Sequence, residues 1–196
     1  MGASGVASLR RASKQLRYLA AIPLIFAVQQ FAEAVQWLVP HPSIASTVAG
    51  YIFLFFALLL WPVYFPLAIL LTEPSSKKNI LGLFAGIGLI ESLFLFSTLV
   101  TRPLEIQLLP KGIFYNIDVP WFEFWILLYA VIVCVSPLFS SHKLVRWFGF
   151  FLALSAVFSA WFFNHTFISV WCFFAAVLSG FIYFGVRRAT KKTTKR

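Results

Sequence analysis

Six long apolar stretches follow one another along the chain, and short polar or proline-containing segments separate them. A helix that crosses the hydrocarbon core of a bilayer needs about 20 apolar residues, and each stretch reaches that length. We therefore predict an all-α fold, a polytopic membrane helical bundle with six transmembrane helices. The predicted spans are residues 18–39, 46–71, 80–100, 121–139, 144–163 and 167–186.

The composition leaves little room for any other domain. Of the 196 residues, 61% are hydrophobic and 11% are charged, whereas soluble domains average about 25% charged residues. We expect a basic N-terminal segment at 1–17, one transmembrane domain at 18–186 and a basic tail at 187–196. A separate soluble catalytic domain does not fit into this length.

Basic residues predict the orientation. All Lys and Arg residues except Arg102 and Lys111 lie on one side of the six predicted spans. Cytoplasmic loops are enriched in Lys and Arg, so both termini are expected in the cytoplasm. The net charge of +10 is then a topology signal, and we expect a lipid bilayer around the chain and no nucleic-acid partner.

The first span also resembles a signal peptide, because Ala32-Glu33-Ala34 has the small-x-small pattern of a cleavage site. Gln29 and Gln30 interrupt the apolar stretch just before this site. We therefore favour an uncleaved first helix.

Polar side chains follow one face of this first span. At about 100° per residue, Gln29, Glu33 and Gln36 fall within an arc of about 60°, with Gln30 beside them. Charged and amide groups at membrane depth normally face the bundle interior or a wet cavity, and they often mark a functional site. The stripe is therefore the first candidate site.

Glu91 supplies a second acid, in the third predicted span. At about 1.5 Å per residue, Glu33 lies about 9 Å from the outer end of its span and Glu91 about 13 Å from the end of its own. We predict that both line one outward-facing polar cavity. The expected ligand-binding residues are Glu33, Glu91, Gln29, Gln30, Gln36, His165 and Asn164.

Three functions fit this pattern. The first is binding or transport of a small polar or cationic ligand at the acidic site. The second is a non-catalytic scaffold or complex subunit, in which protonated acids hold helices together. The Gly82-Leu83-Phe84-Ala85-Gly86 motif would then mark a close helix contact, within the chain or in a homo-oligomer. The third and weakest is a membrane-embedded lipid hydrolase.

The sequence assigns no reaction. It contains no GxSG with a downstream His, no HExxH and no Gly-rich phosphate loop, so no catalytic residue is predicted. Two carboxyls and a His could hold a divalent metal, but their spacing is not diagnostic, and the metal stays unassigned. No cofactor is expected. Cys134 and Cys172 lie in different apolar stretches and are expected to be buried thiols.

Three segments resemble a known family: QQFAEAVQW at 29–37, WPVYFP at 61–66 and VWCFFAA at 170–176. With these QQxxEAxxW, WPxxxP and VWCFFAA patterns, the chain is similar to an uncharacterised family of bacterial multi-spanning membrane proteins, a domain of unknown function. The resemblance implies a bacterial cytoplasmic (inner) membrane location and no particular activity. The positions that match the family pattern are Gln30, Glu33, Trp37, Trp61, Pro62, Pro66, Trp171 and Cys172.

Overall fold

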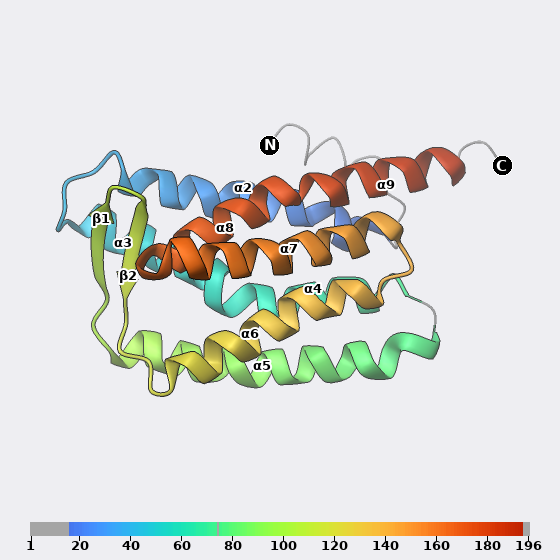
Figure 1. Cartoon of the computed structure of the whole chain (residues 1–196), viewed down its shortest axis with the longest axis horizontal. Helices are drawn as coiled ribbons and strands as arrows, with labels where there is room; N and C mark the ends of the chain where they lie inside the picture. The colour runs from blue at the N-terminus through green and yellow to red at the C-terminus, as the bar shows by residue number, and fades with distance from the viewer. Residues whose placement is uncertain (1–15, 74, 194–196) are drawn as a thin grey trace.

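Six helical segments run side by side in the computed structural model, which describes residues 16–73 and 75–193 (Figure 1). All six are long and apolar enough to cross a membrane, so the predicted all-α bundle of six transmembrane helices is confirmed. The predicted basic segment 1–17 and the end of the basic tail lie largely outside the described residues. The six segments are Arg17–Gln36 (α2), Ile44–Leu70 (α3 to α4), Lys78–Thr101 (α5), Phe122–Phe139 (α6 and η4), Lys143–Phe162 (α7) and Asn164–Arg188 (η5, α8 and the start of α9).

The second segment is not one continuous α-helix. Helix α3 (Ile44–Leu54) is followed by a π-helical turn, η2 (Phe55–Leu60), and then by α4 (Trp61–Leu70). Pro62 lacks a backbone N–H, so a helix that contains it leaves carbonyl groups without their usual donor. The sequence predicts a kink at Pro62, and the structure has this π-helical turn immediately before α4.

A neighbouring helix makes a hydrogen bond to the backbone of this π-helical turn. Ser92 on α5 donates its hydroxyl to the carbonyl oxygen of Leu59 at 2.8 Å. This contact requires a close approach of the two backbones, and Gly88 permits it: a Cβ there would lie 2.0 Å from the carbonyl oxygen of Pro62. Gly86, from the predicted GxxxG motif, has no such neighbour within 4 Å among the described residues. Inside the chain, the close approach is therefore at Gly88.

Stacked aromatic rings fill the bundle interior. The Phe26 ring lies 4.0 Å from that of Trp61, and the Trp61 ring lies 4.8 Å from that of Phe65, as centroid distances. All three side chains are buried. They join α2 to α4 through a continuous apolar layer.

A β-hairpin covers one end of the bundle, which we call the hairpin end (Figure 1). Strands β1 (Glu105–Leu109) and β2 (Gly112–Asn116) are antiparallel and pair Leu109 with Gly112 across a two-residue turn. The sequence predicts no helix or strand between residues 100 and 121, so the hairpin is a new finding. Gly112 has a φ of +148°, a region that favours glycine.

The hairpin packs onto the helices. Ile113 and Tyr115 are buried, and the Tyr115 ring stacks on Phe53 of α3 with centroids 4.9 Å apart. A Cβ at Gly112 would lie 3.0 Å from the Cβ of Thr166, which precedes α8 (Phe167–Leu178). The ribbon is therefore fixed between the second and sixth segments.

The opposite end, which we call the basic end, holds the connections at 71–77 and 140–142 and the end of α9 (Gly180–Thr193) (Figure 1). Glu73 ties the two connections together, since its Oε1 accepts hydrogen bonds from the Ser140 hydroxyl at 2.9 Å and from the Ser141 N–H at 2.6 Å. Lys77 donates to the carbonyl oxygen of Phe139 at 2.8 Å.

The Gly88 contact gives a test of this packing. We expect Gly88→Ala to reduce stability, because its methyl group would collide with the Pro62 carbonyl, and such overpacking costs about 1–3 kcal/mol. The thermal unfolding midpoint of the purified protein in detergent measures the effect. Gly86→Ala is the matched control and should leave the midpoint unchanged or raise it, because nothing lies within 4 Å of its new Cβ among the described residues. Equal midpoints for the two variants would contradict the proposed contact.

Candidate functional site

The polar stripe of α2 faces the interior of the bundle. Gln29 and Gln36 are completely buried, and Glu33 is 6% exposed. The helical spacing of these three residues places them on one face, as the sequence indicates. What differs among them is the set of partners that each side chain finds there.

Gln29 and Gln36 make hydrogen bonds that join the first segment to the second. The indole N–H of Trp61 donates to Gln29 Oε1 at 2.7 Å, which joins α2 to α4 next to the aromatic stack. Gln36 donates to the carbonyl oxygen of Ser46 and accepts from the Ser46 hydroxyl, both at 2.8 Å. His41 is hydrogen-bonded to the Gln36 carbonyl oxygen at 2.7 Å. These contacts fasten the turn between the first two segments.

Gln29 Nε2 and one oxygen of Glu33 are buried without a hydrogen-bond partner in the described part of the chain, and of these two residues only Glu33 lines a pocket. Gln30 donates to Glu33 Oε2 at 3.1 Å, and the Ser169 side chain lies close to the same carboxyl group. Glu33 Oε1 is buried and has no hydrogen-bond partner within residues 16–73 and 75–193. Leaving a buried polar atom unpaired is costly, so such an atom indicates a place for water or a ligand donor.

Glu33 lines a pocket of about 500 Å3, which we call the Glu33 pocket. The end of α2, the turn of the hairpin and the start of α8 form its walls. Trp37 and Phe173 are each 54% exposed, so the pocket lies at the side of the bundle. The lining residues are Gln30, Glu33, Ala34, Trp37, Pro110, Lys111, Gly112, Phe163, Ser169, Val170, Phe173 and Phe174.

Tyr115 brings a second unpaired polar group close to Glu33. Its side chain interacts electrostatically with Glu33 and Cys172. Burial raises the pKa of the Tyr115 phenol well above its ordinary value, so the group stays neutral and keeps its proton. Its hydroxyl group is buried without a hydrogen-bond partner in the described part of the chain.

The structure does not bring Glu91 into the Glu33 pocket. Glu91 is completely buried beside the backbone of Tyr129, and neither carboxylate oxygen makes a hydrogen bond to a described residue. Counting about 1.5 Å per residue, Glu33 lies about 4.5 Å from the end of α2, and Glu91 about 15 Å from the end of α5. The two acids therefore sit at different depths along their helices.

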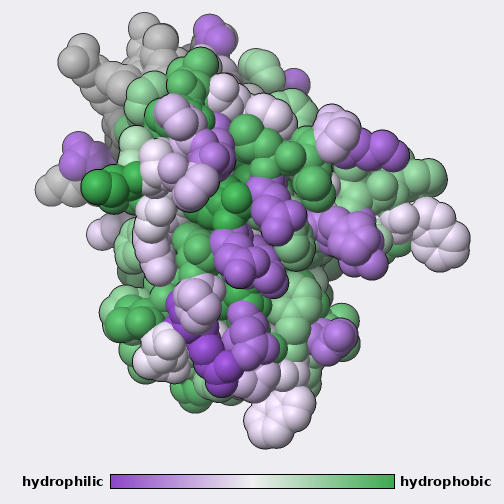
Figure 2. All heavy atoms as spheres, turned by 90° about the vertical axis from the view of Figure 1, so that its left-hand side faces the viewer, coloured by the Kyte–Doolittle hydropathy of each residue, from purple (hydrophilic) through white to green (hydrophobic). Residues whose placement is uncertain are grey.

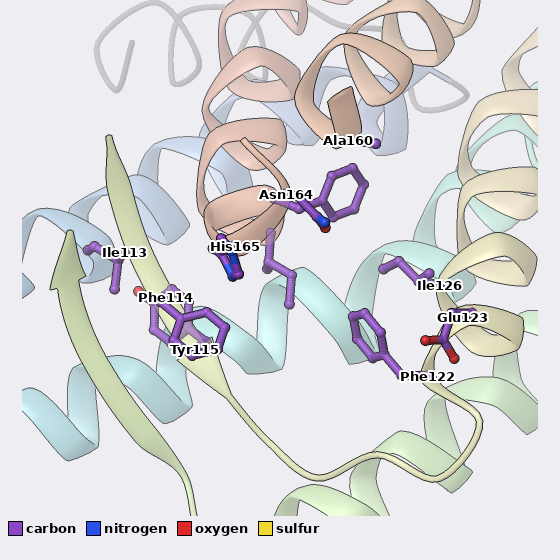
Figure 3. Close-up of a pocket in the computed structure, with 11 residues that line it drawn as sticks. Ile113, Phe114, Tyr115, Phe122, Glu123, Ile126, Ala160, Asn164 and His165 are labelled. Carbon is purple, nitrogen blue, oxygen red and sulfur yellow. The ribbon is translucent and has the colours of Figure 1, made fainter. Parts of the chain in front are cut away.

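His165 and Asn164 line another pocket, of about 440 Å3, which we call the His165 pocket (Figure 3). Both residues belong to η5 (Asn164–Thr166), and Glu123, at the start of α6, lines the same pocket. The His165 ring meets the ring of Phe114 edge-on, with centroids 6.3 Å apart. Sequence analysis grouped His165 and Asn164 with Glu33, and the structure separates them.

Among the lining residues that sequence analysis did not propose as ligands, Lys111 and Ser169 carry an ammonium and a hydroxyl group. Lys111 had one visible signal, since it is one of only two basic residues on its side of the predicted spans. Ser169 had none, because a serine in an apolar helix is common. Within the described ranges, no group of three His, Cys, Asp or Glu residues is arranged to hold a metal ion.

A comparison with known families bears on the whole chain. The model of a family of unknown function, DUF6629, matches residues 1–196. The chain belongs to the DUF6629 family. This membership confirms the predicted resemblance to an uncharacterised family, and DUF6629 comes with no activity to transfer. No curated protein and no solved structure matches the chain. In this member of DUF6629, the Glu33 pocket and the His165 pocket are the candidate functional sites.

The accessibility of the Glu33 pocket to water can be tested with single cysteines. Ala34 is exposed and lines the pocket, whereas Ala32 is 6% exposed. We expect a water-soluble maleimide to label Ala34→Cys rapidly in membranes, and Ala32→Cys at least tenfold more slowly, since thiol reactivity follows access. Cys134 and Cys172 are buried, which keeps the background low. Equal rates for the two variants would mean that water does not enter the pocket.

Proposed function

We propose that this protein is a multi-pass membrane protein that binds a small polar, cationic ligand in the Glu33 pocket. The observation behind this proposal is the buried Oε1 of Glu33, which lines a pocket and lacks a donor among the described residues. An ammonium group supplies both the missing N–H and a compensating charge. A carboxyl group at membrane depth with space beside it fits such a ligand better than it fits dry packing.

We infer that the ligand reaches the pocket from the outer side of a cytoplasmic membrane. The hairpin end holds Arg102 and Lys111, and all other Lys and Arg residues belong to the opposite side of the spans. This distribution favours cytoplasmic termini and an external hairpin. Figure 2, which looks onto the hairpin end, shows hydrophilic side chains gathered across its middle.

The surroundings of Gln29 favour binding over transport. Gln29 lies one helical turn before Glu33, toward the basic end, and the indole of Trp61 is bonded to it. Phe26 and Phe65 stack against the same indole. Passage to the basic end would require this layer to open, so a transport cycle would have to displace Trp61.

A scaffold function is the second candidate, and the buried contacts of Gln36 favour it. In that case the Glu33 carboxyl would be one more packing group, in line with the use of polar side chains between membrane helices. The two functions differ in whether Glu33 responds to an added amine.

Protection of the Ala34→Cys thiol provides the main test, with ethanolamine as the probe. We expect ethanolamine to slow maleimide labelling, and Glu33→Gln to weaken this protection at least tenfold, because a hydrogen bond to a charged group is worth about 1.5–3 kcal/mol. Ethylene glycol, which has no charge, should not protect.

Glu123→Gln is the matched control, since it removes a carboxylate from the His165 pocket only. Protection in this variant should equal that of the parent protein. If ethanolamine protects the folded Glu33→Gln variant as well as the parent, the amine does not bind at Glu33 and the scaffold function is preferred.

Orientation has its own test. Gln107 lies exposed on the hairpin and Ser141 is exposed at the basic end. We expect a membrane-impermeant thiol reagent to label Gln107→Cys in intact cells, and to label Ser141→Cys only after the cells are permeabilised. Labelling of Ser141→Cys in intact cells would invert the proposed topology.

A further inference from the structure

An acidic and a basic side chain line the Glu33 pocket without forming a salt bridge with each other. Glu33 is buried in α2, and Lys111 is exposed in the turn of the hairpin. The salt bridge found among the described residues joins Arg102 to Asp118, and Lys111 makes none there with Glu33. A pocket with separated positive and negative walls is complementary to a ligand that has both charges.

The rest of the wall is apolar and meets the side of the bundle. Trp37 and Phe173 are both 54% exposed, and they belong to segments long and apolar enough to cross a membrane or to the turn next to one. In a membrane, the exposed Trp37 and Phe173 would meet lipid at the rim of the pocket. Glu33 lies about 4.5 Å from the end of α2 at 1.5 Å per residue, so its carboxyl group is close to the hairpin end of the helix.

We propose that the Glu33 pocket binds the headgroup of a zwitterionic lipid that has a primary amine, a deepening that rests on the proposed function. The ammonium group enters sideways and donates to Glu33 Oε1. The phosphate meets Lys111 at the surface. The acyl chains stay outside, along Trp37 and Phe173.

The unpaired oxygen of Glu33 selects the type of amine. A primary ammonium has N–H donors, whereas a quaternary ammonium has none, so only the first can satisfy Oε1. Aromatic rings such as Trp37 can attract either cation through their faces. That attraction does not distinguish the two amines, and the buried carboxylate oxygen therefore decides the preference.

The volume of the pocket agrees with a headgroup. At about 500 Å3 it lies within the range of about 300–1,000 Å3 typical of small-molecule sites. A soluble zwitterion with an amine and a phosphate has the same two charged groups as the lipid headgroup. The exposed aromatic wall favours the lipid.

Retention of lipid by the purified full-length protein tests the inference. Native mass spectrometry follows exchange in detergent containing equal amounts of phosphatidylethanolamine and phosphatidylcholine. We expect phosphatidylethanolamine to be retained at least tenfold more, the ratio that corresponds to one charge-assisted hydrogen bond. Glu33→Gln should bring this ratio close to one. Lys111→Gln should lower the retention of both lipids a few-fold, the range of an exposed ion pair, and keep the ratio, because both lipids carry the phosphate.

Arg102→Gln is the matched control for Lys111→Gln, because it removes the other basic residue of the hairpin end and leaves the pocket intact. It should retain both lipids as well as the parent protein does. Lys111 is exposed in a turn, so its replacement tests the inference even if Glu33→Gln does not fold. Unchanged lipid retention in Lys111→Gln, or no preference for phosphatidylethanolamine in the parent protein, overturns the lipid assignment.

Soluble phosphoethanolamine tests whether the ligand is a soluble zwitterion or a lipid headgroup. If it protects the Ala34→Cys thiol while phosphatidylethanolamine is not retained, the ligand is a soluble zwitterion and the lipid inference fails. Protection by ethanolamine would then still support the proposed function. If neither amine protects the thiol and no lipid preference exists, both proposals fail together.

Discussion

Backbone hydrogen bonding in the absence of water is the constraint on which this structure depends. Within a hydrocarbon layer, every N–H and C=O group must find a partner inside the protein. Most segments meet this requirement mainly through their own helical hydrogen bonds, but the second contains a π-helical turn before Pro62. The Ser92 hydroxyl donates to the Leu59 carbonyl across the interface, and Gly88 lets the backbones approach. One irregularity thus determines how α4 and α5 pair.

Hydrogen-bond partners also distinguish three polar residues that lie on the same face of α2. Gln29 and Gln36 share a face with Glu33, yet both find complementary groups on the second segment, Trp61 and Ser46. Their role is to fix the angle and spacing of the first two segments. Glu33 lies between them with one oxygen unpaired among the described residues. The candidate ligand-binding residue therefore lies between two residues that join the first two segments.

Sequence analysis predicted what apolar length and helical periodicity determine. The six spans and the inward face of α2 follow from these two regularities. The hairpin was missed because its strands have five residues each and lie in a connection of mixed polarity. The grouping of Glu91 and His165 with Glu33 required the rotation of three helices about their axes. That rotation depends on contacts such as Gly88 against Pro62, which no single segment reveals.

The hairpin borders both pockets at once. Lys111 and Gly112 line one, while Ile113, Phe114 and Tyr115 line the other. The two strands are paired with each other, and Tyr115 stacks on Phe53, so a ligand that displaced the tip of this ribbon would shift the wall of the second pocket as well. Occupation of one pocket would then change the affinity of the other, and by thermodynamic reciprocity the effect would be equal in both directions.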